Sequence, residues 1–130
     1  VTIDPLLIGL NKPSTRLYQT NLFIHCVGER SLGLQAAQVN STIAMLRRVL
    51  ALEEVEVLAI GPRMSLTARC AVALAPTGQF GMIATENELE SFDDLLAPTA
   101  TYAAMPEAYC FGLMRHFDLL TLKLLAIPGK

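Results

Sequence analysis

The residues of this chain best suited to chemistry lie in the stretch VEVLAIGPRMSLTARCAVAL, residues 55–74. A short β-branched run, a Gly61-Pro62 break and an apolar helical pattern predict a strand, a tight turn and a helix. A nucleophile presented at such a turn needs a base within hydrogen-bond reach and an acid that orients the base. Ser65 is the candidate nucleophile. A serine at a helix start is more simply an N-cap, because its side chain accepts a backbone hydrogen bond.

The candidate bases are His25 and His116, the only histidines of the chain. His116 lies close to Asp118, but a histidine at a helix start is more simply structural or solvated. Cys26 follows His25 directly, which suggests thiol chemistry. If this pair is on a strand, the two side chains point to opposite faces and are poorly placed for proton transfer. We therefore assign no catalytic residue, and Ser65 only if the chain is an ester hydrolase.

The sequence predicts neither a metal site nor a cofactor. Five carboxylates lie close together in sequence: Glu86, Glu88, Glu90, Asp93 and Asp94. They lack the glycine and the ligand spacing of a calcium loop, so they predict a solvated acidic face. Three cysteines lie far apart in apolar context and without CxxC spacing: Cys26, Cys70 and Cys110. They predict buried free thiols rather than disulfides or a zinc site.

Composition limits the classes of partner. The chain has 130 residues, enough for one domain, with 52% hydrophobic and 17% charged residues and a net charge of −2. Its basic residues are scattered apart from Arg47-Arg48, which argues against a nucleic-acid face. Its apolar runs are too short to span a bilayer, and no signal segment opens it. We expect a soluble protein, cytosolic by default, that binds neither nucleic acid nor membrane.

The elements that position these residues follow from periodicity. Apolar residues spaced three and four apart predict a helix over 31–50, with Ser31 as its cap. Residues 55–60 and 79–84 predict buried strands and 65–75 a helix between them, a right-handed βαβ unit with parallel strands. Residues 1–30 predict an irregular lead-in with at most a short element near 22–26, and 31–130 an αβαβα core. A short helix near 88–96 and another over 119–126, capped by Asp118, complete the expectation.

Four segments from Gly28 onward together resemble the central part of an α/β-hydrolase of the acetyl xylan esterase-like or dienelactone hydrolase-like branches. GERSLGLQAAQVNSTIAMLRRVL is similar to the helix before the nucleophile strand, and residues 55–74 to that strand, its elbow and the next helix. FGMIATENELESFDDLL resembles the following strand and loop. MPEAYCFGLMRHFDLLTLKLLAIPGK resembles the run that leads to the strand of the catalytic acid. With the βαβ pattern, the resemblance implies an α/β fold, a three-layer, mostly parallel sheet with helices on both faces.

The predicted elbow departs from the Gly-x-Ser-x-Gly pattern, in which small residues permit a strained turn with serine at its tip. Aligning Gly61 with the first glycine puts Arg63 at the nucleophile and Ser65 at the last glycine. Arginine stays protonated and is no nucleophile. The resemblance thus implies an inactive relative, a non-catalytic domain with a packing or interaction role. We expect Arg63 to be solvated or paired with a carboxylate between Glu86 and Asp94.

Two alternatives stay open. The first is a carboxylic ester hydrolase whose catalytic acid and histidine lie outside this chain. The second is a small flavodoxin-like domain that binds a ligand at the carboxyl ends of strands 55–60 and 79–84. A sheet cut from a larger one leaves unpaired edges and uncovered apolar faces. We therefore expect self-association, or packing against the rest of a longer chain.

Overall fold

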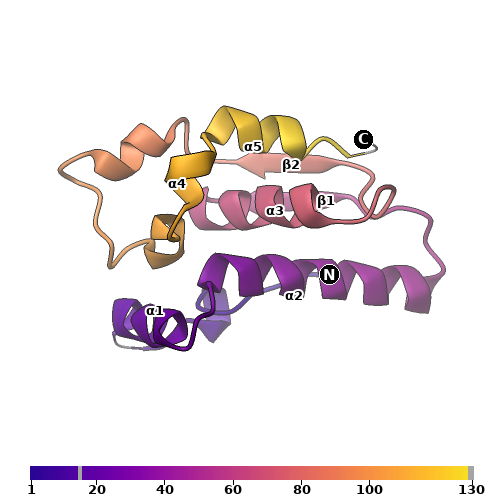
Figure 1. Cartoon of the computed structure of the whole chain (residues 1–130). Coiled ribbons are helices and arrows are strands. Elements are labelled where there is room, and N and C mark those ends of the chain that lie inside the picture. Colours follow the sequence, from indigo (N-terminus) through magenta and orange to yellow (C-terminus); the bar gives the residue numbers. More distant parts are fainter. Residues whose placement is uncertain (15, 129–130) are drawn as a thin grey trace.

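Helices make up most of the chain, and its sheet has only two strands (Figure 1). The computed structural model describes residues 1–14 and 16–128, so the last two residues of the hydrolase-like segments lie outside it. The α-helices are α1 (Leu17–Cys26), α2 (Ser31–Leu50), α3 (Pro62–Leu74), α4 (Leu113–His116) and α5 (Leu119–Leu125). The strands are β1 (Val57–Ile60) and β2 (Ile83–Glu86), and the 3-10 turns are η1 (Gly9–Asn11), η2 (Phe92–Leu96) and η3 (Pro106–Tyr109).

The predicted parallel pair of strands is confirmed. Strands β1 and β2 pair in parallel, with Val57 opposite Ile83 and Ile60 opposite Glu86, and α3 connects them. Strand β2 begins at Ile83 rather than at Gln79. The Gln79 side chain is instead buried and donates to the Asn40 carbonyl of α2 at 2.9 Å. The Gly81 N–H still donates to the Val55 carbonyl at 3.1 Å, so the strand pairing extends to Gly81 but not to Gln79, whose side chain anchors to α2.

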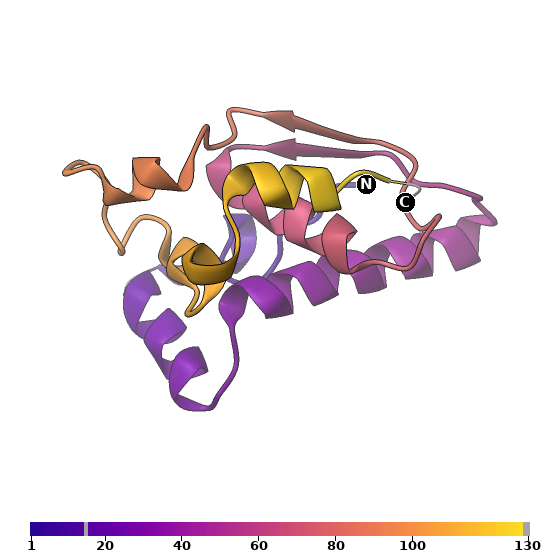
Figure 2. The same ribbon diagram turned by 45° about the horizontal axis from the view of Figure 1, so that its top comes forward.

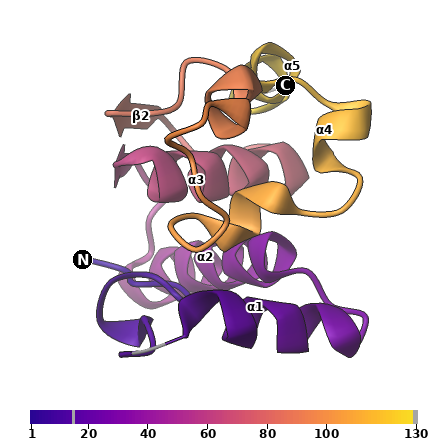
Figure 3. The ribbon, with the colours of Figure 1, turned by 90° about the vertical axis from the view of Figure 1, so that its left-hand side faces the viewer.

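The prediction of a three-layer sandwich is wrong. Within the described residues the sheet has two strands of four residues each, too few for two covered faces. Helices α3 and α5 lie on one side of it, and Figure 3 shows both strands at the left-hand edge of the molecule. The other face stays open, with Leu58 57% and Ile60 59% exposed. The protein is a small, mostly helical domain, because the segments that would have widened the sheet form helices and turns.

The irregular lead-in is also a wrong prediction, because residues 17–26 form the ten-residue helix α1. This helix lacks an apolar stripe: it buries Leu17 and Asn21 and exposes Phe23. Asn21 Nδ2 donates to the Tyr102 hydroxyl at 2.7 Å and to the Pro106 carbonyl at 3.3 Å. The helix is thus held by polar contacts to distant residues, which a search for apolar periodicity does not detect.

Helix α2 has the predicted bounds and forms the floor of the core (Figure 2). Its stripe buries Leu32, Ala36, Val39 and Ile43 in a cluster that also contains residues of α3, η2, η3 and α5. Ser31 is not the cap as predicted. It is the first helical residue, is fully buried, and its hydroxyl makes no hydrogen bond to another described residue.

Helix boundaries elsewhere follow from local chemistry. Helix α3 begins at Pro62, not at Ser65, because proline suits the first helical position, where its missing N–H is not needed. The predicted cap of α5 is confirmed, with Asp118 Oδ1 accepting from the Thr121 N–H at 2.5 Å. The helix expected near 88–96 is the 3-10 turn η2, which begins with a capping box at Ser91.

No helix in the described part of the chain is long and apolar enough to cross a membrane.

Gly61, the N-cap of α3, has φ 85° and ψ 162°, a region that essentially only glycine adopts. We expect Gly61→Ala to lower the free energy of unfolding by about 1–3 kcal/mol. An added Cβ would have no other atom within 4 Å, so the cost comes from the backbone alone. Chemical denaturation followed by circular dichroism measures it.

Gly33→Ala is the matched control for this prediction. Gly33 is exposed inside α2, and a Cβ there would meet only the Arg30 Cβ at 3.8 Å. Alanine is the better helix former, so we expect a gain of about 0.5–1 kcal/mol. Equal and small effects of the two substitutions would contradict the assigned conformation of Gly61.

Candidate functional site

Arg63, at the position aligned with a nucleophile, lies in a bidentate ion pair with Glu107 of η3. Its Nε donates to Glu107 Oε1, and its Nη2 donates to Oε2 at 3.0 Å. The Glu107 side chain is completely buried and that of Arg63 is 18% exposed. The prediction of a partner between Glu86 and Asp94 is therefore wrong. A planar guanidinium that grips a carboxylate with two parallel bonds is a positioning device, with no group free to attack a substrate.

The same guanidinium also holds the N-terminal segment. Arg63 Nη2 donates to the Leu7 carbonyl at 2.8 Å. Leu7 is 1% exposed and has φ 65°, a conformation that costs a non-glycine residue free energy. The neighbouring Leu6 is tied to α2, where the Gln35 amide donates to its carbonyl at 2.7 Å and its N–H donates to Gln38 Oε1 at 2.8 Å. Residues 6 and 7 thus join α2, α3 and η3.

Ser65 is not presented as a nucleophile. It lies inside α3, is 1% exposed, and its hydroxyl donates to the Ala59 carbonyl of β1 at 3.4 Å. Nor is it the predicted N-cap, because Gly61 occupies that position. A buried hydroxyl that donates to the backbone cannot be reached by a substrate, so Ser65 links α3 to β1.

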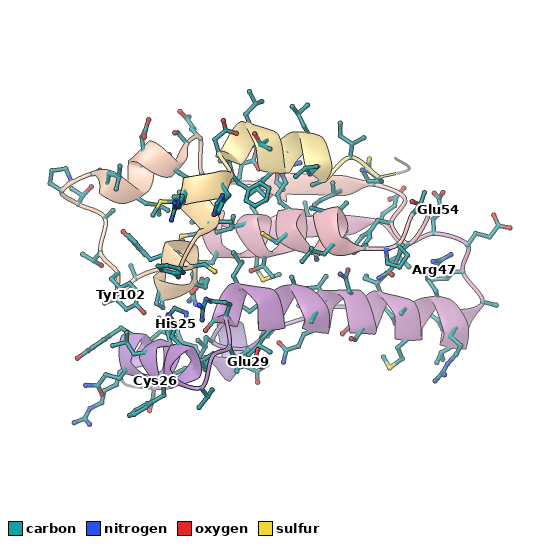
Figure 4. All side chains as sticks on the ribbon, viewed as in Figure 1. His25, Cys26, Glu29, Arg47, Glu54 and Tyr102 are labelled. Carbon is teal, nitrogen blue, oxygen red and sulfur yellow. The ribbon has the colours of Figure 1, made fainter. Side chains whose placement is uncertain are left out.

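The structure keeps both histidines apart from Ser65. His25 lies on α1, at the end of the molecule where Tyr102 also lies (Figure 4), with its Nε2 3.5 Å from Asn21 Nδ2. Burial, and to a smaller extent the charge of Arg30, lowers the pKa of His25, which favours the neutral ring. His116 is exposed at the end of α4. Cys26 and His25 are consecutive residues of a helix rather than of a strand, and such neighbours do not face each other either.

The acidic set does not form one solvated face. Glu88 bridges α3 and α5, with its Oε1 2.8 Å from Lys123 Nζ and its Oε2 3.1 Å from Arg69 Nη2. Burial raises the pKa of Glu88, but hydrogen bonds from Lys123 and Arg69 outweigh it and hold this pKa below its usual value. Asp94 instead accepts from the Ser91 N–H in the cap of η2. No cluster of three or more metal-ligating side chains is present in residues 1–14 and 16–128.

The three cysteines are free, as predicted, but not all are buried. Cys70 is buried in α3, and this burial, with a smaller effect of Cys110, raises its pKa to about 12. Cys110 is partly buried, which also raises its pKa, against an opposing effect of Arg30. Cys26 is exposed on α1, because that segment is a surface helix and not part of a sheet.

A cavity of about 670 Å³ runs between β1, α2 and the N-terminal segment, which we call the β1 groove. Helix α2 and the start of α3 line it with Val39, Ile43, Leu46, Leu50, Met64 and Ala68. Residues 1–4 and the segment from Leu52 to Ile60 complete its walls. In Figure 3 the N-terminal end of the chain lies at the same left-hand edge of the molecule as the strands, farther from β2 than β1 is. The groove follows the side of β1 and its described lining includes no residue of β2, whereas the flavodoxin-like alternative requires its ligand at the carboxyl ends of both strands.

Breaking the Arg63–Glu107 pair from one side leaves the other charge buried. We expect Arg63→Met to lower the free energy of unfolding by about 3–5 kcal/mol. The double variant Arg63→Met/Glu107→Leu removes both charges and should recover a large part of this loss, by at least about 1 kcal/mol. Arg48→Met, at an exposed position of α2, is the control and should change stability by less than about 0.5 kcal/mol. In urea denaturation, a double variant no more stable than Arg63→Met would contradict the pairing.

Thiol labelling tests the placement of the three cysteines. Only the thiolate reacts, and Cys70, with a pKa of about 12, is almost entirely protonated at pH 8 as well as buried. With an aromatic disulfide reagent at that pH, we expect Cys26 to react first, Cys110 more slowly, and Cys70 only after unfolding. Mass spectrometry of partly labelled protein assigns the order. Fast labelling of Cys70 in the folded protein would contradict the packing of α3.

Comparison with known proteins gives no relative. The chain matches no family model, no curated protein and no solved structure at a significant level. The geometry of its own residues therefore carries the functional argument.

Proposed function

We propose that this chain is a non-catalytic interaction domain, related to the α/β-hydrolases through the strand, turn and helix of residues 55–74. The proposal rests on one observation, the hydrogen bonds that the Arg63 guanidinium makes. Its Nε and Nη2 are engaged, by Glu107 and by the Leu7 carbonyl. The turn that presents a nucleophile in an active hydrolase here holds three segments of the chain together.

The surroundings of the turn support an absence of hydrolytic chemistry. Ser65, the alternative nucleophile, is buried and donates to Ala59, while His25 and His116 lie on α1 and α4. Acyl transfer through a serine requires the hydroxyl, a base and an orienting acid in one hydrogen-bonded chain. The bonds made by these described residues do not form such a chain.

An interaction role is supported by the apolar surface that the small sheet leaves open. On its outer face Leu58, Ile60 and Met82 are each more than half exposed. Because exposed apolar surface of this kind marks contacts with other molecules, the sheet is the natural place for a partner to bind. We still predict that the partner is a second copy of the chain. Sedimentation tests this by measuring the oligomeric state.

Turnover of an activated acetyl ester by the purified protein tests the proposal. We expect the wild type, Ser65→Ala and Arg63→Ser to stay at the rate of buffer and of denatured protein, because none of them has a nucleophile paired with a base. Each variant is first checked for a cooperative unfolding transition. Activity well above background in the wild type, lost in Ser65→Ala, would overturn the proposal and favour the esterase alternative.

A further inference from the structure

Strand β1 has one unpaired edge, and this edge opens into the β1 groove. The Val57 N–H donates to the Met82 carbonyl at 2.9 Å, and the Gly61 N–H donates to the Glu86 carbonyl at 2.8 Å. Alternate residues of a strand direct their backbone groups to the same side, so those of Leu58 and Ile60 point away from β2. Among the described residues, none bonds to these groups, although Leu58 and Ile60 both line the groove. The edge is a free template for another strand.

The floor of the groove is apolar and partly open to solvent. Helix α2 contributes Leu46 and Leu50, the latter 55% exposed, and Leu52 before β1 is 42% exposed. An extended chain paired with β1 would direct every second side chain toward this floor. Main-chain bonds at a sheet edge combined with pockets for alternate side chains are the physical basis of strand addition.

The charged residues that line the β1 groove indicate which kind of strand could bind there. Its charged side chains are acidic: Glu56, which Glu53 and Glu54 precede along the chain, and Asp4, whose Oδ2 accepts from the Leu10 N–H at 3.0 Å. Lysine and arginine are absent from its described lining. A fatty acid would bring a carboxylate into an acidic site and leave the strand edge unpaired. Another copy of this chain would bring its own glutamates, because β1 follows Glu56 and β2 ends in Glu86.

We propose that the β1 groove binds an extended peptide segment of a partner protein, with alternating apolar side chains and flanking basic residues, as an added strand on the edge of β1. The proposal rests on the interaction role proposed above and names its site and its partner chemistry. The backbone of the peptide pairs with Leu58 and Ile60, its apolar side chains cover α2, and its basic side chains approach Glu56.

The test uses two fluorescein-labelled peptides, KVTVTVTK and its charge-reversed twin EVTVTVTE, with binding followed by fluorescence anisotropy at low salt. We expect the lysine peptide to bind at least about tenfold more tightly than its twin, with the difference shrinking in high salt. Glu56→Lys should weaken binding of the lysine peptide by about three- to tenfold. Glu29→Lys, the same charge change at an exposed position between α1 and α2, is the matched control and should leave binding unchanged.

Hydrogen exchange by NMR tests the strand pairing independently of affinity. With saturating lysine peptide, the amides of Leu58 and Ile60 should exchange at least about tenfold more slowly, whereas the Val57 amide, already bonded to β2, should change little. Leu58→Pro removes the edge donor but no bond of the β1–β2 ladder. It should abolish peptide binding while the protein keeps a cooperative unfolding transition.

Equal affinity of the two peptides, no binding up to about 1 mM, or unchanged exchange at Leu58 and Ile60 would each overturn the proposal. So would protection of these amides without peptide in a protein that sediments as a dimer, because a second copy would then occupy the edge. These results leave the non-catalytic role standing, since only serine-dependent ester turnover contradicts it.

Discussion

The ion pair between Arg63 and Glu107 is the interaction on which the arrangement of this small domain depends. Glu107 has no exposed side-chain surface, so without a partner its carboxylate would lose hydration and gain nothing in return. Arg63 satisfies it with two donors and uses a third bond to hold Leu7. Pairs of this kind add little net stability over apolar packing, whereas breaking one from a single side is costly. Here they bring together residues 7, 63 and 107.

A sheet of two short strands sets the second constraint. Two strands of four residues cannot form a stable unit alone and need packing against helices. Helix α3 supplies this packing on one face, and α5 packs in turn against α3. The opposite face and the free edge of β1 receive no such cover from the described residues. In the larger parallel sheets of α/β proteins both faces are covered by helices. The open apolar face and the acidic groove are the direct result of stopping at two strands.

Much of the local structure could be predicted from the sequence. The stripe of α2 is long and regular, the cap of α5 is an aspartate placed before an apolar run, and the strand, turn and helix of residues 55–74 carry distinct signals. Helix α1 could not be found in this way because it buries Asn21 against Tyr102 and Pro106, residues about eighty positions away. The sequence predicts the start of α3 at Ser65 because serine is a common cap, whereas Pro62 already opens the helix.

Some features of the candidate site likewise follow from the sequence, and others depend on the tertiary structure. The sequence by itself determined that Arg63, at the position aligned with a nucleophile, cannot act as one, since the residue type alone fixes that its side chain stays protonated. It also determined that β1 and β2 run in parallel, because the single short helix between them permits a crossover. Only the tertiary structure decided that Arg63 pairs with Glu107 rather than with Glu86 to Asp94, that Ser65 is buried, and that one edge of β1 lies open beside α2. These features depend on contacts between residues distant in sequence, where no local periodicity specifies the partner.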